Sequence, residues 1–192
     1  MAGKKASDEA ALPVDLAELL SGLRSLQTAL QRHKRDRHKR RVSFGDLITD
    51  RWQNALEHGF GEGSSCYDDV LVLGRVEVGC NTWIGPGVVL DGSGGKLVIG
   101  SHCDISAGVQ IYTHSTVRRA VSLGQEPVET ASTQIGNGVY VGPNSIVSMG
   151  VTIGDQAVIG AMSFVNSDIP SGKKAWGCPA RIAGDVDLPS DQ

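Results

Sequence analysis

From Val72 onward, an aliphatic residue recurs at every sixth position, and this period constrains the fold more than any other feature of the chain. A six-residue unit is too short to bury its own apolar side chain, so such units must coil and stack into one continuous core. We interpret each unit as a short strand and a turn, with the aliphatic side chain pointing inward and a following glycine allowing the corner. The thirteen inward positions are Val72, Val78, Ile84, Leu90, Ile99, Ile105, Ile111, Ile135, Val141, Val147, Ile153, Ile159 and Val165.

The period is interrupted twice. The step from Leu90 to Ile99 contains the insert DGSGG, and the step from Ile111 to Ile135 contains a long excursion at residues 115–132. With three units in each coil, both interruptions fall near one corner of a prism of about four coils. Loops inserted on a rigid scaffold are where binding sites accumulate. We therefore expect the functional site at this corner.

Leucines follow a different period upstream of the repeats. They are spaced by three and four residues in turn, which is the a/d seam of a heptad pattern, and Pro13 suits the first turn of such a helix. Two heptads are too short for an isolated coiled coil, but they would hold once larger contacts bring chains together. The seam consists of Leu16, Leu19, Leu23, Leu26 and Leu30.

A second helix is expected at residues 44–58. Ser43 and Asp46 have the spacing of a capping box, and Gly59 suits the end of the helix. The sequence therefore divides into four parts. These are a helical N-terminal segment with a short coiled coil at 1–41, a helical linker at 42–70, the repeat domain at 71–170 with its excursion at 115–132, and a C-terminal segment at 171–192.

Positive charge is concentrated in the run RHKRDRHKRR at residues 32–41. Residues 1–41 carry 10 Lys and Arg against 5 acids, whereas residues 42–192 carry 8 against 16. The run indicates either an anionic partner, which includes a peripheral contact with a membrane surface, or a solvated helix face. We expect no nucleic acid partner, because no aromatic residue interleaves with the run and the rest of the chain is acidic.

Composition and the N-terminal sequence exclude further classes. Aromatic residues make up 5% of the chain while Gly reaches 25 of 192, which favours many tight turns over a bulky mixed core. Uninterrupted apolar runs do not reach the ~18 residues that a membrane-spanning helix needs. The first ten residues lack the apolar centre of a signal peptide, and the four cysteines show no Cys-x-x-Cys spacing. These features predict a cytoplasmic protein.

Three stretches resemble a known family: GVQIYTHSTV, TQIGNGVYVGPNSIVSMGVTIGDQAVIGAMSFVNSDIP and AWGCPARIAG. They are similar to the hexapeptide-repeat acyltransferases, and among these to the galactoside and maltose O-acetyltransferases and the sugar acetyltransferases of surface-polysaccharide pathways. The resemblance implies an all-β fold, the left-handed parallel β-helix; its handedness comes from the resemblance alone, because parallel crossovers are otherwise almost always right-handed. It also implies a homotrimer with active sites between neighbouring prisms, and acetyl-CoA as the co-substrate.

His114, in the YTH segment at the mouth of the excursion, matches the catalytic histidine of this family. Attack of a hydroxyl on a thioester needs a base near neutral pH, because the free hydroxyl is a weak nucleophile. Asp91, beside the DGSGG insert, is expected to orient the imidazole or to hold a sugar hydroxyl; otherwise it is a turn aspartate that bonds its own backbone. Tyr112 is expected to contact the acceptor.

The resemblance also implies which groups bind the thioester and coenzyme A. The oxyanion donor of the family aligns with Pro143, which has no N–H, so Gly142 is the expected substitute. Arg181 matches an arginine that meets the adenosine-phosphate end, where charge-assisted hydrogen bonds suit phosphate. A lysine that the family often carries is Ser167 here, so some cofactor contacts must differ. The remaining cofactor contacts are expected from Tyr140, Gly142, Gly160, Ala161, Lys173 and Lys174.

These residues predict an acetyl-CoA-dependent O-acetyltransferase that acts on the hydroxyl of a sugar or sugar nucleotide and uses no metal. The nearest alternative is an N-acetyltransferase for a nucleotide-linked amino sugar, although such enzymes often carry a nucleotide-binding segment where this chain has its leucine seam and basic run. A β-helix zinc enzyme would need three histidines, and only His102 and His114 lie in the repeats. A non-catalytic prism that serves as a scaffold is the remaining alternative.

Overall fold

The computed structural model describes residues 16–187, so the predicted role of Pro13 lies outside the described part. The described part of the chain forms two compact units, which divide between Ile48 and Thr49. In the first unit, α1 (Leu16–His38) is followed by α2 (Phe44–Ile48). Four of the five seam leucines of α1 face solvent in the single chain, with Leu16 53% and Leu23 41% exposed, while Leu30 is half-buried. The helix is thus present as expected, and most of its apolar stripe is exposed in the described part of the chain.

The helix expected at residues 44–58 is wrong in one respect, because it is two helices. After α2, the side chain of Asp50 accepts hydrogen bonds from the backbone N–H groups of Trp52 and Gln53 at 3.0 and 3.1 Å. This N-cap starts a new helix, α3 (Arg51–Glu57), since it satisfies donors that have no partner at a helix start. The predicted stop is confirmed: Gly59 has a left-handed φ of 74°.

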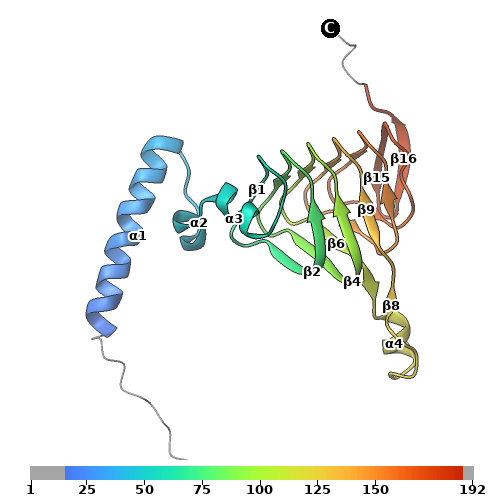
Figure 1. The fold of residues 1–192 in the computed structure, drawn as a ribbon, viewed down its shortest axis with the longest axis horizontal. Coiled ribbons are helices and arrows are strands. Elements are labelled where there is room, and N and C mark those ends of the chain that lie inside the picture. Colours follow the sequence, from blue (N-terminus) through green and yellow to red (C-terminus); the bar gives the residue numbers. More distant parts are fainter. Residues whose placement is uncertain (1–15, 188–192) are drawn as a thin grey trace, which may run out of the picture. The chain divides into compact units, whose positions relative to one another are not determined.

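Three faces of short parallel strands form a prism in the second unit (Figure 1). The first face stacks β1 (Ser65–Cys66), β3 (Trp83–Ile84), β5 (Asp104–Ile105), β10 (Tyr140–Val141), β13 (Val158–Ile159) and β15 (Lys173–Gly177). The second and third faces share a sheet, because β2 (Leu71–Val78) and β4 (Val89–Ile99) each run across the corner between them. The second face continues through β6 (Gln110–Tyr112), β11 (Ile146–Val147) and β14 (Phe164–Val165), and the third through β9 (Thr133–Ile135) and β12 (Thr152–Ile153).

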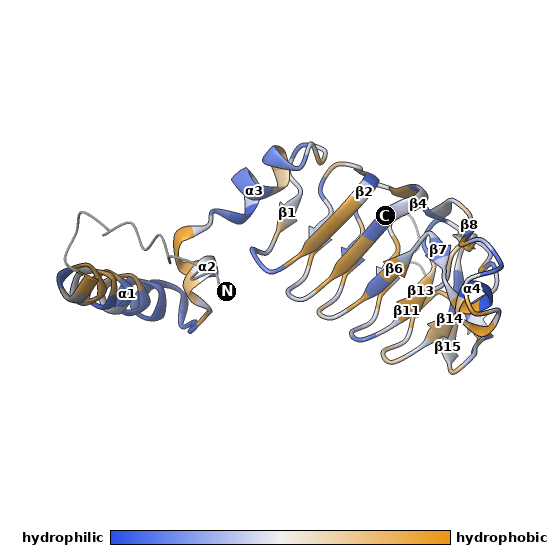
Figure 2. Cartoon of the chain, turned by 90° about the horizontal axis from the view of Figure 1, so that it is seen from below, coloured by the Kyte–Doolittle hydropathy of each residue, from blue (hydrophilic) through white to orange (hydrophobic). Residues whose placement is uncertain are grey.

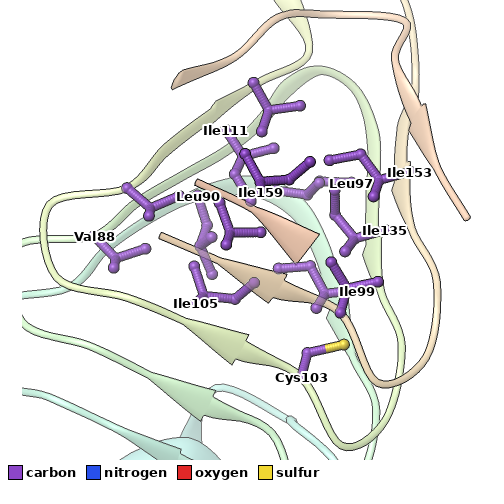
Figure 3. Close-up of a cluster of buried hydrophobic side chains, with 14 of the residues drawn as sticks. Val88, Leu90, Leu97, Ile99, Cys103, Ile105, Ile111, Ile135, Ile153 and Ile159 are labelled. Carbon is purple, nitrogen blue, oxygen red and sulfur yellow. The ribbon is translucent and has the colours of Figure 1, made fainter. Parts of the chain in front are cut away.

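The core of the prism is the predicted ladder of aliphatic side chains (Figure 3). Twelve of the thirteen inward positions are buried, and only Val72, near the first coil, is half-buried. Ile84, Ile105 and Ile159 stack on one face with no exposed surface. Each unit therefore buries its aliphatic residue against the units above and below it, as the period requires.

The glycine after each aliphatic residue does not have the expected role. This glycine does not adopt the left-handed conformation of the corner. Glycine is needed there because the backbone of the next coil lies too close to leave room for a Cβ atom. A Cβ on Gly142, for example, would lie 2.5 Å from the backbone nitrogen of Ala161. The left-handed backbone occurs three residues after the aliphatic position, at Asn81, Gly87, His102, Gly108, Gly138, Asn144, Gly150, Gln156 and Met162.

The prism is longer than the expected 71–170 and has more than four coils. Its first face holds six parallel strands, from β1 at residue 65 to β15 at residue 177. Cys66 and Ala175 extend the ladder at its two ends, both without exposed surface. Cys66 stands six residues before Val72, so it keeps the period with a small thiol in place of an aliphatic side chain.

The segment after residue 170 continues the prism instead of forming a separate part. Here β15 pairs in parallel with β13, and then antiparallel with β16 (Ala180–Asp185).

In the described residues, no helix combines the length and apolar character that a membrane crossing requires. Figure 2 shows hydrophobic residues along β2 and β11, in which Leu71, Leu73 and Ile146 are exposed.

Candidate active site

His114 lies where the excursion leaves the prism. It begins β7 (His114–Ser115), which pairs antiparallel with β8 (Glu129–Thr130), so that both ends of the excursion are held together. Between them, α4 (Val117–Val121) follows β7. The His114 side chain is 27% exposed, so the imidazole is mostly packed against its neighbours but remains partly accessible to solvent.

A buried carboxylate lies against the imidazole. Asp91 Oδ2 is 3.4 Å from His114 Nδ1, and the Asp91 side chain is only 6% exposed. The other oxygen, Oδ1, accepts hydrogen bonds from the backbone N–H of Ser93 at 2.9 Å and from its hydroxyl at 2.5 Å. The Ser93 Oγ is also 3.5 Å from His114 Nδ1. The two alternatives for Asp91 thus combine, because it makes the bond of a turn aspartate with one oxygen and faces the imidazole with the other.

The DGSGG insert packs directly against the segment that carries His114. The Thr113 hydroxyl donates to the Asp91 carbonyl at 2.8 Å and accepts from the N–H groups of Gly94 and Gly95, each at 3.1 Å. A Cβ on Gly94 would lie 2.5 Å from the Cβ of His114, so only glycine lets the two coils approach this closely. The sequence placed both interruptions at one corner, but it gave no signal that singled out Ser93 or Thr113.

A hollow of about 290 Å³ opens beside His114. Its wall contains hydroxyl groups from Ser115, Thr116 and Ser148, and apolar surface from the second face of the prism. The predicted Tyr112 is part of it: its ring meets the His114 ring edge-on at 6.3 Å, and its hydroxyl donates to Gln110 Oε1 at 2.7 Å. The described residues that line the hollow are Tyr112, His114, Ser115, Thr116, Ile146, Ser148, Met149 and Phe164.

The expected oxyanion donor is wrong. The Gly142 N–H donates to the Ile159 carbonyl of the next coil at 2.8 Å, so it belongs to the ladder of the prism and is not free for a substrate. The Gly160 N–H is used in the same way by the Ala175 carbonyl at 2.9 Å. Parallel coils consume such N–H groups in their own hydrogen bonds, which the alignment of a single segment cannot reveal.

The expected coenzyme contacts lie on the first face and the terminal hairpin, and none of them lines the hollow at His114 among the described residues. Tyr140 is 40% exposed on the first face. The Arg181 side chain donates to the Ala180 carbonyl at 2.8 Å. Lys173 forms an ion pair with Asp185, and Lys174 pairs with Asp187 at 2.7 Å. This pairing lowers the pKa of the Asp187 carboxyl, through a hydrogen bond from Lys174 and through its charge.

The described residues contain no group of three or more His, Cys, Asp or Glu side chains that could hold a metal ion. His102, the second histidine of the repeats, occupies a left-handed corner with a φ of 58°. His102 therefore lies in a turn of the repeat, whereas His114 lies in β7.

Residues 132–167 match the family model of the bacterial transferase hexapeptide, six repeats. The chain carries the hexapeptide repeat of bacterial transferases. One relative of this hexapeptide-repeat chain is the galactoside O-acetyltransferase of Escherichia coli K12, 46% identical over 52 residues, which are 27% of this chain and 26% of that protein. Another is the carnitine operon protein CaiE of Escherichia coli, 29% identical over 126 residues, 62% of this chain and 64% of that protein. The chain thus matches less than two thirds of the length of either relative.

Among solved structures, the hexapeptide-repeat chain is similar to a mutant of AntD, an N-acyltransferase from Bacillus cereus, in complex with dTDP and coenzyme A. The TM-score is 0.60 at 20% identity, over 67% of this chain and 73% of that chain. Together with the repeat, this likeness in fold identifies the prism as a left-handed parallel β-helix. The resemblance noted in the sequence, to the hexapeptide-repeat acyltransferases, is confirmed.

Proposed function

We propose that this protein transfers an acetyl group from acetyl-CoA to a carbohydrate hydroxyl, with His114 as the general base. The observation that carries the proposal is the buried Asp91 carboxylate 3.4 Å from His114 Nδ1. A carboxylate in this place holds the proton on Nδ1, so that the lone pair is on Nε2. The galactoside O-acetyltransferase among the relatives supports acetyl transfer to a sugar hydroxyl as the reaction class.

In the proposed reaction, Nε2 of His114 takes the proton of the acceptor hydroxyl while its oxygen attacks the thioester carbonyl. A C–O bond forms, the C–S bond breaks as the tetrahedral intermediate collapses, and the imidazolium returns its proton to the departing thiolate. The products are the acetyl ester and free coenzyme A thiol. Asp91 stabilises the imidazolium while it exists, and base catalysis of this kind contributes about 10²–10⁴-fold in rate.

The hollow beside His114 has the chemistry that a sugar ring needs. Ser115, Thr116 and Ser148 carry hydroxyls that both donate and accept hydrogen bonds. Ile146 and Phe164 add an apolar wall suited to the C–H faces of a pyranose. A sugar ring carries hydroxyl groups at its edge and C–H groups on its faces. It can therefore form hydrogen bonds with the hydroxyl-bearing residues and apolar contacts with the hydrophobic wall.

The proposal includes a homotrimer, because the chain leaves two apolar surfaces uncovered. On the second face of the prism, Leu71 is 49% and Ile146 is 36% exposed. On α1, Leu19 and Leu26 of the heptad seam are 47% and 46% exposed. Burial of both surfaces between copies removes apolar area from water, and it adds a second wall to the hollow, which Ile146 lines.

Coenzyme A is proposed to bind along the same prism, with Tyr140 and Ala161 beside the pantetheine arm and Arg181 at the phosphates. Lys173 and Lys174 take part only if phosphate displaces their partners Asp185 and Asp187. That exchange costs little for surface ion pairs of this kind.

Acyl transfer to the amino group of a nucleotide-linked amino sugar is the second candidate. The observation that favours it is the likeness to AntD, an N-acyltransferase whose structure contains dTDP. The test for both is release of free thiol from acetyl-CoA by wild type and His114→Asn, with sugars, amino sugars and nucleotide sugars as acceptors. Turnover with neutral sugars that is lost in the variant supports the O-acetyltransferase. Turnover only with amino sugars supports the alternative, and no thiol release with any acceptor contradicts both.

A further inference from the structure

The basic run at residues 32–41 is folded into a helix end and a reversal. Its first part is the last turns of α1, and at Lys39 the backbone takes a left-handed φ of 55°. The Lys39 N–H still donates to the Arg35 carbonyl at 2.9 Å. Gln31 Nε2 then donates to the Arg40 carbonyl at 3.2 Å, which ties the returning segment to α1. The backbone of the run therefore follows a defined turn.

This reversal encloses a hollow of about 620 Å³ within the first unit. Arg32 and Arg35 line it from α1, where they stand one helical turn apart on the same side. Arg41 lines it from the returning segment, together with Ser43 and Phe44. No Asp or Glu of the described residues belongs to the lining. Three arginines thus share one hollow, and Ser43 of its wall donates its hydroxyl to the carboxylate of the buried Asp46 at 3.3 Å.

Of the acids near these arginines in sequence, Asp36 does not neutralise the hollow. Asp36 lies 3.6 Å from Arg35 Nε, and both side chains are 66% exposed, so the pair is screened by water and contributes little. Its contact is with Nε, which leaves the terminal nitrogens of Arg35 for another partner. The adjacent His38 responds to the same concentration of charge: its pKa is lowered by loss of hydration and by the positive charges of Arg37 and Lys34.

We propose that the arginine cup, defined as Arg32, Arg35 and Arg41, binds a ligand with at least two phosphate groups, such as an organic diphosphate. A guanidinium presents a planar fork of N–H groups that matches two oxygens of a phosphate, and hydrogen bonds to an ionised acceptor are roughly twice as strong as neutral ones. The hollow has the size of a small-molecule site, and Phe44, 37% exposed, offers apolar surface to the organic part. This binding does not depend on the proposed acetyl transfer.

The test is a calorimetric titration of the full chain with inorganic pyrophosphate at low salt. The cup variant is Arg32→Gln/Arg35→Gln/Arg41→Gln. The matched control is Lys34→Gln/Arg37→Gln/Arg40→Gln, which removes the same charge from the same run but from residues outside the lining. We expect the cup variant to bind about tenfold more weakly or worse, as loss of several charge-assisted hydrogen bonds requires. The control should lose no more than about threefold, because it alters only the screened long-range field.

Equal losses in the two variants would overturn the cup, since they would mean that charge alone attracts the ligand. Absence of pyrophosphate binding by wild type at millimolar concentration would overturn it as well. Helical circular dichroism of both variants checks that α1 has folded. The variant Arg32→Lys/Arg35→Lys/Arg41→Lys keeps the charge and loses the forks, so binding that remains at wild-type strength would also contradict the proposal.

Vesicles that contain cardiolipin, a lipid with two phosphate groups, distinguish the two sources of such a ligand. If the cup takes a lipid headgroup, wild type floats with the vesicles, pyrophosphate releases it, and the cup variant no longer floats. If the ligand is a free diphosphate, pyrophosphate binds with the same dependence on the cup, and wild type does not float. Flotation that is equal in wild type and cup variant would contradict a specific cup.

Discussion

Asp91 and His114 are brought together by the register between two coils. The pairing of β4 with β6 sets Asp91 beside Tyr112, and the turn after Tyr112 carries His114 over the carboxylate, to 3.4 Å between Oδ2 and Nδ1. The insert after Asp91 then closes below the imidazole. The base and the group that orients it therefore come from adjacent coils, and any change in coil register would separate them.

Replacement of His114 should abolish most turnover. We expect His114→Asn to lower kcat by about 10²–10⁴-fold with little change in the KM for acetyl-CoA, because the variant loses only the acceptor of the proton. His102→Asn is the matched control: His102 is in the same repeats, and Asn tolerates its left-handed φ of 58°. The control should keep kcat. Equal activity of the two variants in a steady-state assay would remove His114 from the role of base.

Asp91 is expected to act through His114. Asp91→Asn keeps a side chain that accepts from Ser93 but removes the negative charge that stabilises the imidazolium, so kcat should fall about tenfold or more while acetyl-CoA binding persists. Asp104→Asn, at an exposed position of the first face, serves as the control. The measurement is kcat against KM for both substrates. A rise in acceptor KM alone, with kcat unchanged, would instead assign Asp91 to acceptor binding.

The exposed second face predicts an oligomer. Ile146→Asp places a charge in the apolar surface proposed to pack between copies, and we expect it to shift the protein from trimer to monomer in sedimentation velocity. Gln134→Asp introduces the same group at an exposed position of the third face and should leave the trimer intact. Wild type that sediments as a monomer at micromolar concentration would contradict the proposal directly.

Glycines in the two units should respond oppositely to alanine. At Gly142 a Cβ would meet backbone of the next coil at 2.5 Å, so Gly142→Ala should lower the free energy of unfolding by about 1–3 kcal/mol through overpacking. At Gly22, within α1, a Cβ would meet nothing within 4 Å. Gly22→Ala should therefore stabilise α1 by up to about 1 kcal/mol. Denaturant unfolding followed by circular dichroism measures both, and a stable Gly142→Ala prism would refute the close-approach explanation.

The cysteines should divide into two reactive and two protected thiols. Burial, reinforced by the negative charge of Asp69, raises the pKa of Cys66 to about 12, and burial also raises the pKa of Cys103. Both stay neutral at pH 8, whereas Cys80 and Cys178 are exposed. A colorimetric thiol reagent should therefore detect two fast thiols in the native protein and all four after unfolding. Four fast thiols in the native protein would contradict the buried ladder.

The same shifts predict a loss of stability in alkali. Above the ordinary thiol pKa of 9.0, unfolded chains release the Cys66 proton while the folded protein retains it up to about pH 12. The unfolded state then binds fewer protons, so the free energy of unfolding falls as pH rises through this window. Cys66→Ser should flatten that fall in a pH series of denaturant midpoints.

The repeat, the inward residues and the position of His114 beside the excursion could be predicted from the sequence alone. The six-residue period is a local pattern, and its aliphatic residues have only one way to leave water, so Ile84 and its equivalents could be assigned without a structure. The excursion at 115–132 was equally visible, because it breaks that period beside His114. Capping chemistry also predicted Ser43, whose hydroxyl accepts a hydrogen bond from the Asp46 N–H at 3.3 Å, and the helix stop at Gly59, since such contacts act over three or four residues.

Which groups approach the imidazole, and which N–H groups already form hydrogen bonds, follows from tertiary contacts. Thr113 reaches Asp91 through the stacking of coils, whereas Ser93 bonds it within one turn, and Gly142 gives its N–H to Ile159 one coil away. The arginine cup likewise exists because the chain reverses at Lys39. These contacts depend on the register between coils and on the direction that the chain takes after a turn. A local sequence pattern does not define either of them.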